Sequence, residues 1–186
     1  MNRRWILRKR PQGGLAKGDL ELVEEPIPDL SEGEVLLRNL YLSLDPTNRI
    51  WMSDREQYLP PVGIGDVMRG VTIAVVESSR SDRIKEGQIV SPHSGGWEVY
   101  SKCGERQVSV VETMDQVPLT AEMSVLGATG ATAYFGMTDI GQPKEGETVV
   151  ISAAAGAVGS IAGQLARIAG AKAVGICGGG LPVAYA

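Results

Sequence analysis

A short turn rich in alanine and glycine, "AAAGAVG" at residues 153–159, has the residue types and spacing for binding a phosphate group. Ala153, Gly156 and Gly159 take the three positions of a G-x-G-x-x-G dinucleotide turn, with Ala in place of the first Gly. Gly156 lets the backbone approach a pyrophosphate, and Gly159 lets the following helix pack closely on the preceding strand. Amide groups at the helix N-terminus add donors and a favourable dipole. We therefore predict nucleotide binding here, with tight helix packing alone as the alternative.

The residues after the next strand distinguish two dinucleotides. An Asp or Glu about 20 residues beyond the turn would bind the ribose 2′-hydroxyl of NAD. This chain has Cys177, Gly178 and Gly179 at that place, so NAD lacks its usual partner and the 2′-phosphate of NADP meets no repulsion. No Lys or Arg occurs after Lys172, which lies at the wrong end of the strand. The absence of an acidic residue is thus the feature that favours NADP.

The segments around the turn predict a strand, a helix and a second strand. "ETVVIS" and "AKAVGIC" are short apolar runs typical of buried strands, and "AVGSIAGQLARIAG" has helical spacing. Residues 147–177 have the length of one βαβ unit, for which parallel pairing and a right-handed crossover are expected. An earlier helical section runs over residues 121–141, and "QPKEG" ends it.

Residues up to about 118 predict a different architecture, built from short strands without helices. "DPTNR" (45–49) and "YLPPVGIGD" (58–66) are expected to be irregular loops. Many short strands without helices favour a β-barrel or sandwich. The clearest strands are "EVLLRNLYLSL" (34–44), "VTIAVVES" (71–78), "GQIVSP" (87–92) and "RQVSVVE" (106–112).

The composition argues against several classes of protein. The 186 residues are 43% hydrophobic and 22% charged with a formal net charge of -4, which disfavours disorder and nucleic-acid binding. No apolar run has the length of a signal peptide or a membrane span. Cys103 and Cys177 lack the spacing of a disulfide framework or a zinc site, which favours a reducing, cytoplasmic location. The basic N-terminus predicts an edge strand with a solvated polar face, with a phosphate-binding patch as the alternative.

Several stretches of the sequence resemble the zinc-independent medium-chain dehydrogenase/reductase family. The similarity is greatest to its NADP-dependent branch of curcumin, leukotriene B4/prostaglandin and plant alkenal double-bond reductases. The resemblance implies an α/β fold, with a GroES-like β-barrel substrate domain over residues 1–120 and the first βαβ part of a Rossmann domain over residues 121–186. The matching stretches are "NRRWILRKRP", "LLRNLYLSLDP", "PPVGIGDVMRG", "GWEVY", "GATGATAYFGMTDIGQPKEGETVVISAAAGAVG" and "GICGG".

The resemblance also implies a reaction. A hydride moves from the nicotinamide of NADPH to the β-carbon of an α,β-unsaturated ketone or aldehyde, and the enolate oxygen that results needs hydrogen-bond donors. No metal takes part, because zinc-dependent relatives have a Gly-His-Glu loop where this chain has "GIGDVMRG". His93 is the only histidine, too few for a three-ligand catalytic site. We expect it to be a surface or core residue, with a general-acid role as the alternative.

The same resemblance assigns residues to the cofactor. Gly178 and Gly179 are expected near the adenosine ribose, and Thr129 and Thr132 begin the helix beside the nicotinamide. The pyrophosphate is expected on Ala153, Ala154, Ala155, Gly156, Ala157, Val158 and Gly159.

Three further residues are implied at the reacting end. Tyr134 is a candidate donor to substrate or cofactor, and the alternative is that its ring only packs in the helix. Pro46 and Thr47 are expected to face the substrate. Relatives commonly have Tyr where this chain has Thr47, so the swap removes a phenol donor and enlarges the pocket, which puts a curcumin-like substrate range in doubt.

The end of the chain departs from the family pattern. Relatives continue past "GG" with a Lys-bearing segment and further strands, whereas this chain continues with "GLPVAYA". We therefore expect the N-terminal part of a reductase, truncated after the second strand, and a homodimer only for the full-length enzyme. The alternative is a catalytically inactive fragment that acts at most as a nucleotide- or protein-binding module. A quinone reductase of the same superfamily fits "SLDPTNR" and "GIGDVMRG" less well.

Overall fold

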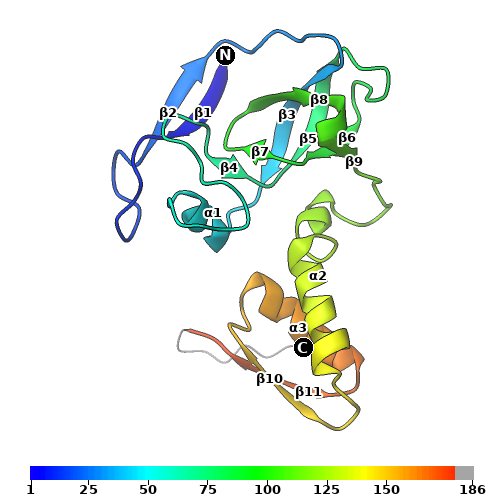
Figure 1. Cartoon of the computed structure of the whole chain (residues 1–186). Coiled ribbons are helices and arrows are strands. Elements are labelled where there is room, and N and C mark those ends of the chain that lie inside the picture. The colour runs from blue at the N-terminus through cyan, green and yellow to red at the C-terminus, as the bar shows by residue number, and fades with distance from the viewer. Residues whose placement is uncertain (179–186) are drawn as a thin grey trace. The chain divides into compact units, whose positions relative to one another are not determined.

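The computed structural model describes residues 1–178 of the 186 and divides the chain into two compact units. The first comprises residues 1–115, and the second begins at residue 116 (Figure 1). Strands dominate the first unit, and the second combines helices with two strands. The expected combination of a β part and an α/β part is confirmed. No helix within residues 1–178 is long and apolar enough to cross a membrane.

A five-stranded antiparallel sheet is the largest element of the first unit. Its strands lie in the order β8 (Tyr100–Gly104), β3 (Glu34–Leu42), β5 (Thr72–Ser79), β6 (Ile89–Pro92) and β9 (Val108–Val110). Residues two apart on a strand point to the same face, and such pairs on β3 and β5 supply much of the core. The buried cluster consists of Val35, Leu37, Ala74, Val76, Ile84, Val90 and Val108. All four strands expected from the sequence are present.

Two shorter antiparallel pairs complete the first unit. β1 (Asn2–Leu7) pairs with β2 (Leu20–Glu25), and β4 (Arg69–Gly70) pairs with β7 (Gly95–Gly96). The expectation that the N-terminal strand lies at an edge is wrong. On the side away from β2, Trp5 N–H donates to the carbonyl of Trp97 and the carbonyl of Trp5 accepts from Met68, each at 2.8 Å. Both flanks of β1 are therefore hydrogen-bonded.

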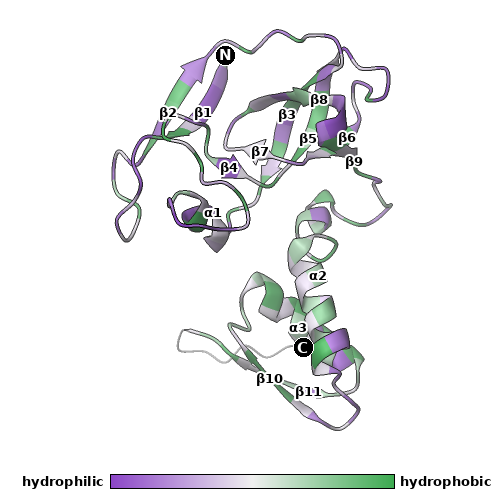
Figure 2. Cartoon of the chain, viewed as in Figure 1, coloured by the Kyte–Doolittle hydropathy of each residue, from purple (hydrophilic) through white to green (hydrophobic). Residues whose placement is uncertain are grey.

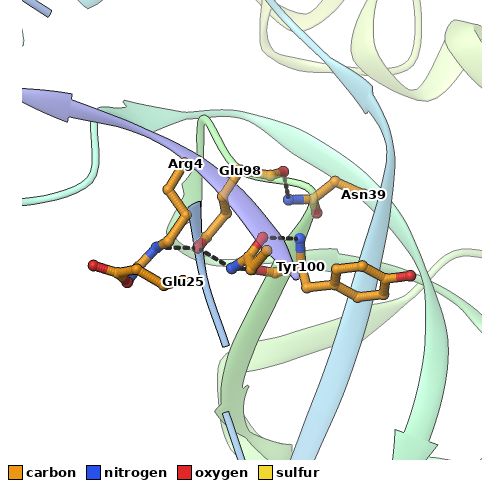
Figure 3. Close-up of polar contacts among 6 residues, drawn as sticks. Arg4, Glu25, Asn39, Glu98 and Tyr100 are labelled. Carbon is orange, nitrogen blue, oxygen red and sulfur yellow. Dashed lines mark hydrogen bonds and ion pairs between the residues drawn. The ribbon is translucent and has the colours of Figure 1, made fainter. Parts of the chain in front are cut away.

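Acidic side chains surround two of the basic residues at the N-terminus. The guanidinium of Arg4 lies 2.6 Å from a carboxylate oxygen of Glu25 and 2.9 Å from one of Glu98 (Figure 3). Arg8 pairs with Glu21 at 2.6 Å. These ion pairs neutralise Arg4 and Arg8 but not Arg10, which has no ion pair in residues 1–178.

One helix stands where the sequence predicted a loop. α1 (Pro46–Trp51) includes most of "DPTNR". The N-cap residue Asp45 donates its backbone N–H to Oδ1 of Asn48 at 2.6 Å, and Pro46 occupies the first helical position. The loop prediction was wrong because Asp followed by Pro is as typical of a helix start as of a turn. The "YLPPVGIGD" segment contains neither helix nor strand, as expected.

The second unit contains the predicted βαβ arrangement. β10 (Thr148–Ser152) and β11 (Lys172–Ile176) pair in parallel, and α3 (Ala157–Ile168) connects them. α2 (Ala128–Phe135) packs against α3 and continues into the π-helical segment η3 (Gly136–Gly141). Figure 2 shows α3 and both strands mostly in white and green, the colours of weakly polar and hydrophobic residues. Their buried cluster consists of Ala133, Ile151, Ala154 and Ala162.

Candidate cofactor and substrate site

The turn between β10 and α3 is tied to both strands of the βαβ unit. Ala153 follows β10 with a φ of 48°, in the left-handed region that favours glycine. Ala154 N–H donates to the carbonyl of Ile176 at 3.0 Å, and Gly156 N–H donates to the carbonyl of Ala153 at 2.8 Å. α3 begins at the next residue. The turn therefore holds a fixed backbone at the start of a twelve-residue helix.

The predicted register of the glycine pattern is wrong at its first position. Ala153 precedes Gly156 by three residues, whereas the first two glycines of G-x-G-x-x-G are two apart, so Ala154 takes the first place by count. Ala154 is fully buried. Gly159 stands where glycine is required, because a Cβ there would overlap the carbonyl oxygen of Ala153 and the Cα of Ala154. The missing side chain lets α3 start directly against the turn.

The outer surface of this turn presents hydrogen-bond donors. Residues 155–158 are exposed and carry only small or medium side chains. Within the described chain, the amides of Ala157 and Val158 donate to no backbone or side-chain acceptor. The first amides of any helix lack a partner inside the helix, and the helix dipole adds partial positive charge there. Such a surface suits an oxyanion such as a pyrophosphate.

The end of β11 bears no acidic side chain. Ile176 is 58% exposed, and Cys177 and Gly178 follow it. Among residues 1–178, a Cβ at Gly178 would have nothing within 4 Å. Gly179 lies outside the described residues.

The hydroxyl groups of Thr129, Thr132 and Tyr134, the predicted site residues of α2, differ in their hydrogen bonding. Thr132 donates its hydroxyl to the carbonyl of Ala128 at 2.7 Å, and Thr129 donates to that of Ser124 at 3.0 Å. Both hydroxyl oxygens can still accept a hydrogen bond. Tyr134 is 52% exposed, and its ring packs edge-on against Phe135 with ring centroids 5.4 Å apart. Its phenol has no hydrogen-bond partner in residues 1–178, so it can still donate to a ligand.

The first unit brings the predicted Thr47 to a phenol that sequence reasoning missed. Thr47 Oγ1 lies 2.8 Å from the hydroxyl of Tyr58, and Trp51 Nε1 donates to the same hydroxyl at 3.2 Å. The guanidinium of Arg69 lies 5.5 Å from the Trp51 ring, close enough for a cation–π contact. Pro46 precedes Thr47 at the first position of α1. No pattern in the sequence pointed to Tyr58, which lies in the loop after α1.

Histidine and cysteine do not gather into a metal site. His93 is exposed, and its Nε2 lies 3.1 Å from Oγ of Ser109. Among residues 1–178, no group of three or more His, Cys, Asp or Glu side chains is arranged to hold a metal ion. Burial, with a smaller contribution from the nearby Glu34 carboxylate, raises the pKa of the Cys103 thiol to about 11. Cys103 is partly buried, and a raised pKa lowers the fraction of the reactive thiolate.

Known proteins resemble this chain along nearly its whole length. Residues 3–111 match the family described as the N-terminal domain of oxidoreductase. The NADPH-dependent curcumin reductase of Escherichia coli K12 is 45% identical over 96% of this chain and 51% of its own length. Prostaglandin reductase 1 of Bos taurus is 42% identical over 97% of this chain and 53% of its own length. The chain thus spans about half the length of the curated relatives it matches.

Solved structures agree with these matches. CurA from Vibrio vulnificus, whose structure is also known in complex with NADPH, is 40% identical and superposes with a TM-score of 0.86. The superposition covers 96% of this chain and 52% of CurA. A quinone oxidoreductase from Thermus thermophilus, also solved with NADPH, is less similar, with 25% identity and a TM-score of 0.60. The predicted resemblance to curcumin and prostaglandin reductases is confirmed, and the chain belongs to the oxidoreductase family that carries this N-terminal domain.

Proposed function

We propose that the chain is the N-terminal part of an NADPH-dependent reductase that acts on the carbon–carbon double bond of α,β-unsaturated ketones or aldehydes. In this proposal residues 1–120 form the substrate domain and residues 121–186 contribute to the dinucleotide site. When bound, NADPH supplies a hydride to the β-carbon of the enone. The relatives named as NADPH-dependent curcumin reductase and prostaglandin reductase 1 support this reaction class.

The turn at the start of α3 is the observation that carries the proposal. It combines small exposed side chains with the unpartnered amides of Ala157 and Val158 at a helix N-terminus. These features fit a pyrophosphate, which needs close backbone approach and several N–H donors. The proposed contacts are made by Ala153, Ala154, Ala155, Gly156, Ala157, Val158 and Gly159. Gly178, Gly179 and Thr132 complete the cofactor contacts.

The preference for NADPH over NADH rests on the end of β11. An acidic side chain there would repel the 2′-phosphate that distinguishes NADPH. Cys177 and Gly178 occupy this place instead, so no acidic side chain at these two positions repels the phosphate.

The substrate is proposed to meet Pro46 and Thr47. As hydride reaches the β-carbon, negative charge develops on the carbonyl oxygen, and a nearby hydroxyl stabilises it by donating a hydrogen bond. The linked hydroxyls of Thr47 and Tyr58 are one source of that bond, and the free phenol of Tyr134 is the other candidate. The Thr47–Tyr58 pair places a phenol in the first unit even though Thr replaces the Tyr that relatives commonly have.

A second candidate is a catalytically inactive binding module. The outward face of the β10–β11 sheet supports it, because Val150, Val174 and Ile176 are 62%, 39% and 58% exposed there. Apolar side chains clustered on one face often mark a protein–protein contact. A cytoplasmic location and a homodimer of the full-length enzyme are likewise proposals.

Two assays on the same purified chain separate these functions. We expect saturable NADPH binding by fluorescence titration, with weaker binding of NADH, and loss of NADPH absorbance when 3-nonen-2-one is added. Binding without turnover would favour the module over the reductase. A folded chain that binds neither dinucleotide would overturn the reductase proposal.

A further inference from the structure

A hollow in the first unit is lined by three arginines. It has a volume of about 440 Å³ and lies between the segment after β1 and the end of α1. Its lining consists of Arg10, Pro11, Gln12, Gly13, Arg49, Ile50, Ser53, Asp54 and Arg55. Pockets of this size hold small organic ligands.

Two of the three guanidinium groups are held in place by backbone carbonyls. Arg49 donates from Nε and Nη2 to the carbonyl of Gly13 at 3.0 and 2.9 Å, and from Nη2 to that of Pro11 at 2.6 Å. Arg10 donates from Nη1 to the carbonyl of Met52 at 2.8 Å. Carbonyl partners orient a guanidinium without cancelling its charge, so the pocket wall is preorganised and positive.

Within residues 1–178, no carboxylate forms an ion pair with these three guanidinium groups. Asp54 is the one acidic residue in the lining, and it forms no ion pair within 4.0 Å with any of the three arginines in the described chain. Four other cations of this unit form ion pairs in the described chain, namely Arg4, Arg8, Arg38 and Lys102. The whole chain carries a net charge of -4, so a general excess of basic residues does not explain three unpaired arginines in one hollow.

We propose that this pocket binds a small organic molecule through its phosphate or carboxylate group. Guanidinium groups recognise both anions by paired, charge-assisted hydrogen bonds. The pocket is separate from the proposed substrate contact, because Thr47 and Arg49 are two residues apart on α1 and therefore point about 200° apart around the helix. The proposal does not depend on the reductase activity.

Calorimetric titration of the whole chain with inorganic phosphate and with succinate, at constant ionic strength, tests the site. We expect saturable binding that Arg55→Gln weakens about tenfold, since hydrogen bonds to charged groups are among the stronger ones. Arg55 is exposed and forms no hydrogen bond or ion pair in the described chain, so we expect the substitution to leave the fold intact. Arg83→Gln is the matched control, because Arg83 is exposed, outside the pocket, and loses the same charge.

Two further variants complete the test. Arg10→Gln is expected to weaken binding as Arg55→Gln does. Ala157→Asp repels phosphate from the α3 turn and should leave binding at the pocket unchanged. The anion that binds more tightly identifies the favoured group, and either one supports the proposal. Absence of saturable binding, or equal weakening by Arg55→Gln and Arg83→Gln, would overturn it.

Discussion

Arg4 and Glu98, 94 residues apart in the chain, form an ion pair of 2.9 Å in which the Glu98 side chain is only 11% exposed. The side-chain amide of Asn2 donates to the same carboxylate and to the backbone carbonyl of Tyr100. Burial raises the pKa of Glu98 above its ordinary value of 4.5, and the charge of Arg4 offsets only part of this effect. The ion pair thus joins β1 to the segment before β8. Because Glu98 is buried, keeping its carboxylate ionised costs free energy.

Replacing Glu98 with Gln should change how stability depends on pH. The folded protein binds the Glu98 proton more tightly than the unfolded chain does, so this residue stabilises the fold below pH 4.5 and loses that contribution as pH rises through its raised pKa. Wild type should therefore gain stability relative to Glu98→Gln as pH falls toward 4.5. Denaturant unfolding followed by tryptophan fluorescence measures this in the first unit, where Trp5, Trp51 and Trp97 all lie.

Replacing Glu34 with Gln should have the opposite pH dependence. The backbone N–H of Ser31 donates to the Glu34 carboxylate at 2.7 Å and Lys102 pairs with it at 3.2 Å, which lowers the pKa of Glu34 below 4.5. This stabilisation is present above pH 4.5 and is lost as pH falls through the lowered pKa. Glu34→Gln should thus be less stable than wild type near neutral pH and approach it in acid. The same fluorescence assay applies, and pH trends of the same sign in the two variants would refute these assignments.

Gly159→Ala should destabilise the βαβ unit. The added Cβ would overlap the carbonyl oxygen of Ala153, and overpacking of this kind costs roughly 1–3 kcal/mol. Gly136→Ala is the matched control, because it lies in a helical conformation with nothing within 4 Å of its Cβ position and should gain up to about 1 kcal/mol. Amide hydrogen exchange of α3 measures both effects. Equal exchange rates in the two variants would show that the close approach at Gly159 carries no energetic weight.

Cys103 should resist alkylation in the folded chain. The thiolate is the reactive form of cysteine. With a pKa of about 11 in place of 9.0, the thiolate fraction of Cys103 at neutral pH is roughly a hundredth of that of an ordinary thiol. We expect iodoacetamide to modify Cys103 about a hundredfold more slowly at pH 7.5 in the folded protein than in denaturant. Mass spectrometry of the peptide that contains residue 103 follows the reaction. Similar rates in the two states would contradict the assigned burial of the thiol.

Elements with a strong local pattern were predictable from the sequence. Alternating or continuous apolar residues identified β3, β5 and the βαβ unit, because those patterns reflect the burial of one or both strand faces. α1 was missed because "DPTNR" has the composition of a turn, and only the capping contact between Asp45 and Asn48 distinguishes a helix start.

Contacts between distant segments were not predictable from local pattern. The ion pair of Arg4 with Glu98 and the flanking of β1 by the segments at Trp97 and Met68 depend on how the chain folds back on itself. The Thr47–Tyr58 contact crosses an irregular loop whose path no periodicity encodes. The glycine turn was located correctly and the close approach predicted at Gly159 is present, but the first place of the pattern was assigned to Ala153, whereas the count gives Ala154.

Binding of NADPH to Ala157 variants tests the central claim most directly. Ala157→Asp places a negative charge at the first position of α3, where it stabilises the helix but repels a pyrophosphate. Ala157→Asn is a neutral control of nearly the same size. Calorimetry on the folded chain should show saturable NADPH binding that Ala157→Asp weakens at least about tenfold and Ala157→Asn weakens less than about threefold, with the helix no less stable in either variant. Equal NADPH affinity in wild type and Ala157→Asp, or no binding by folded wild type, would contradict the assignment of this turn as the pyrophosphate site.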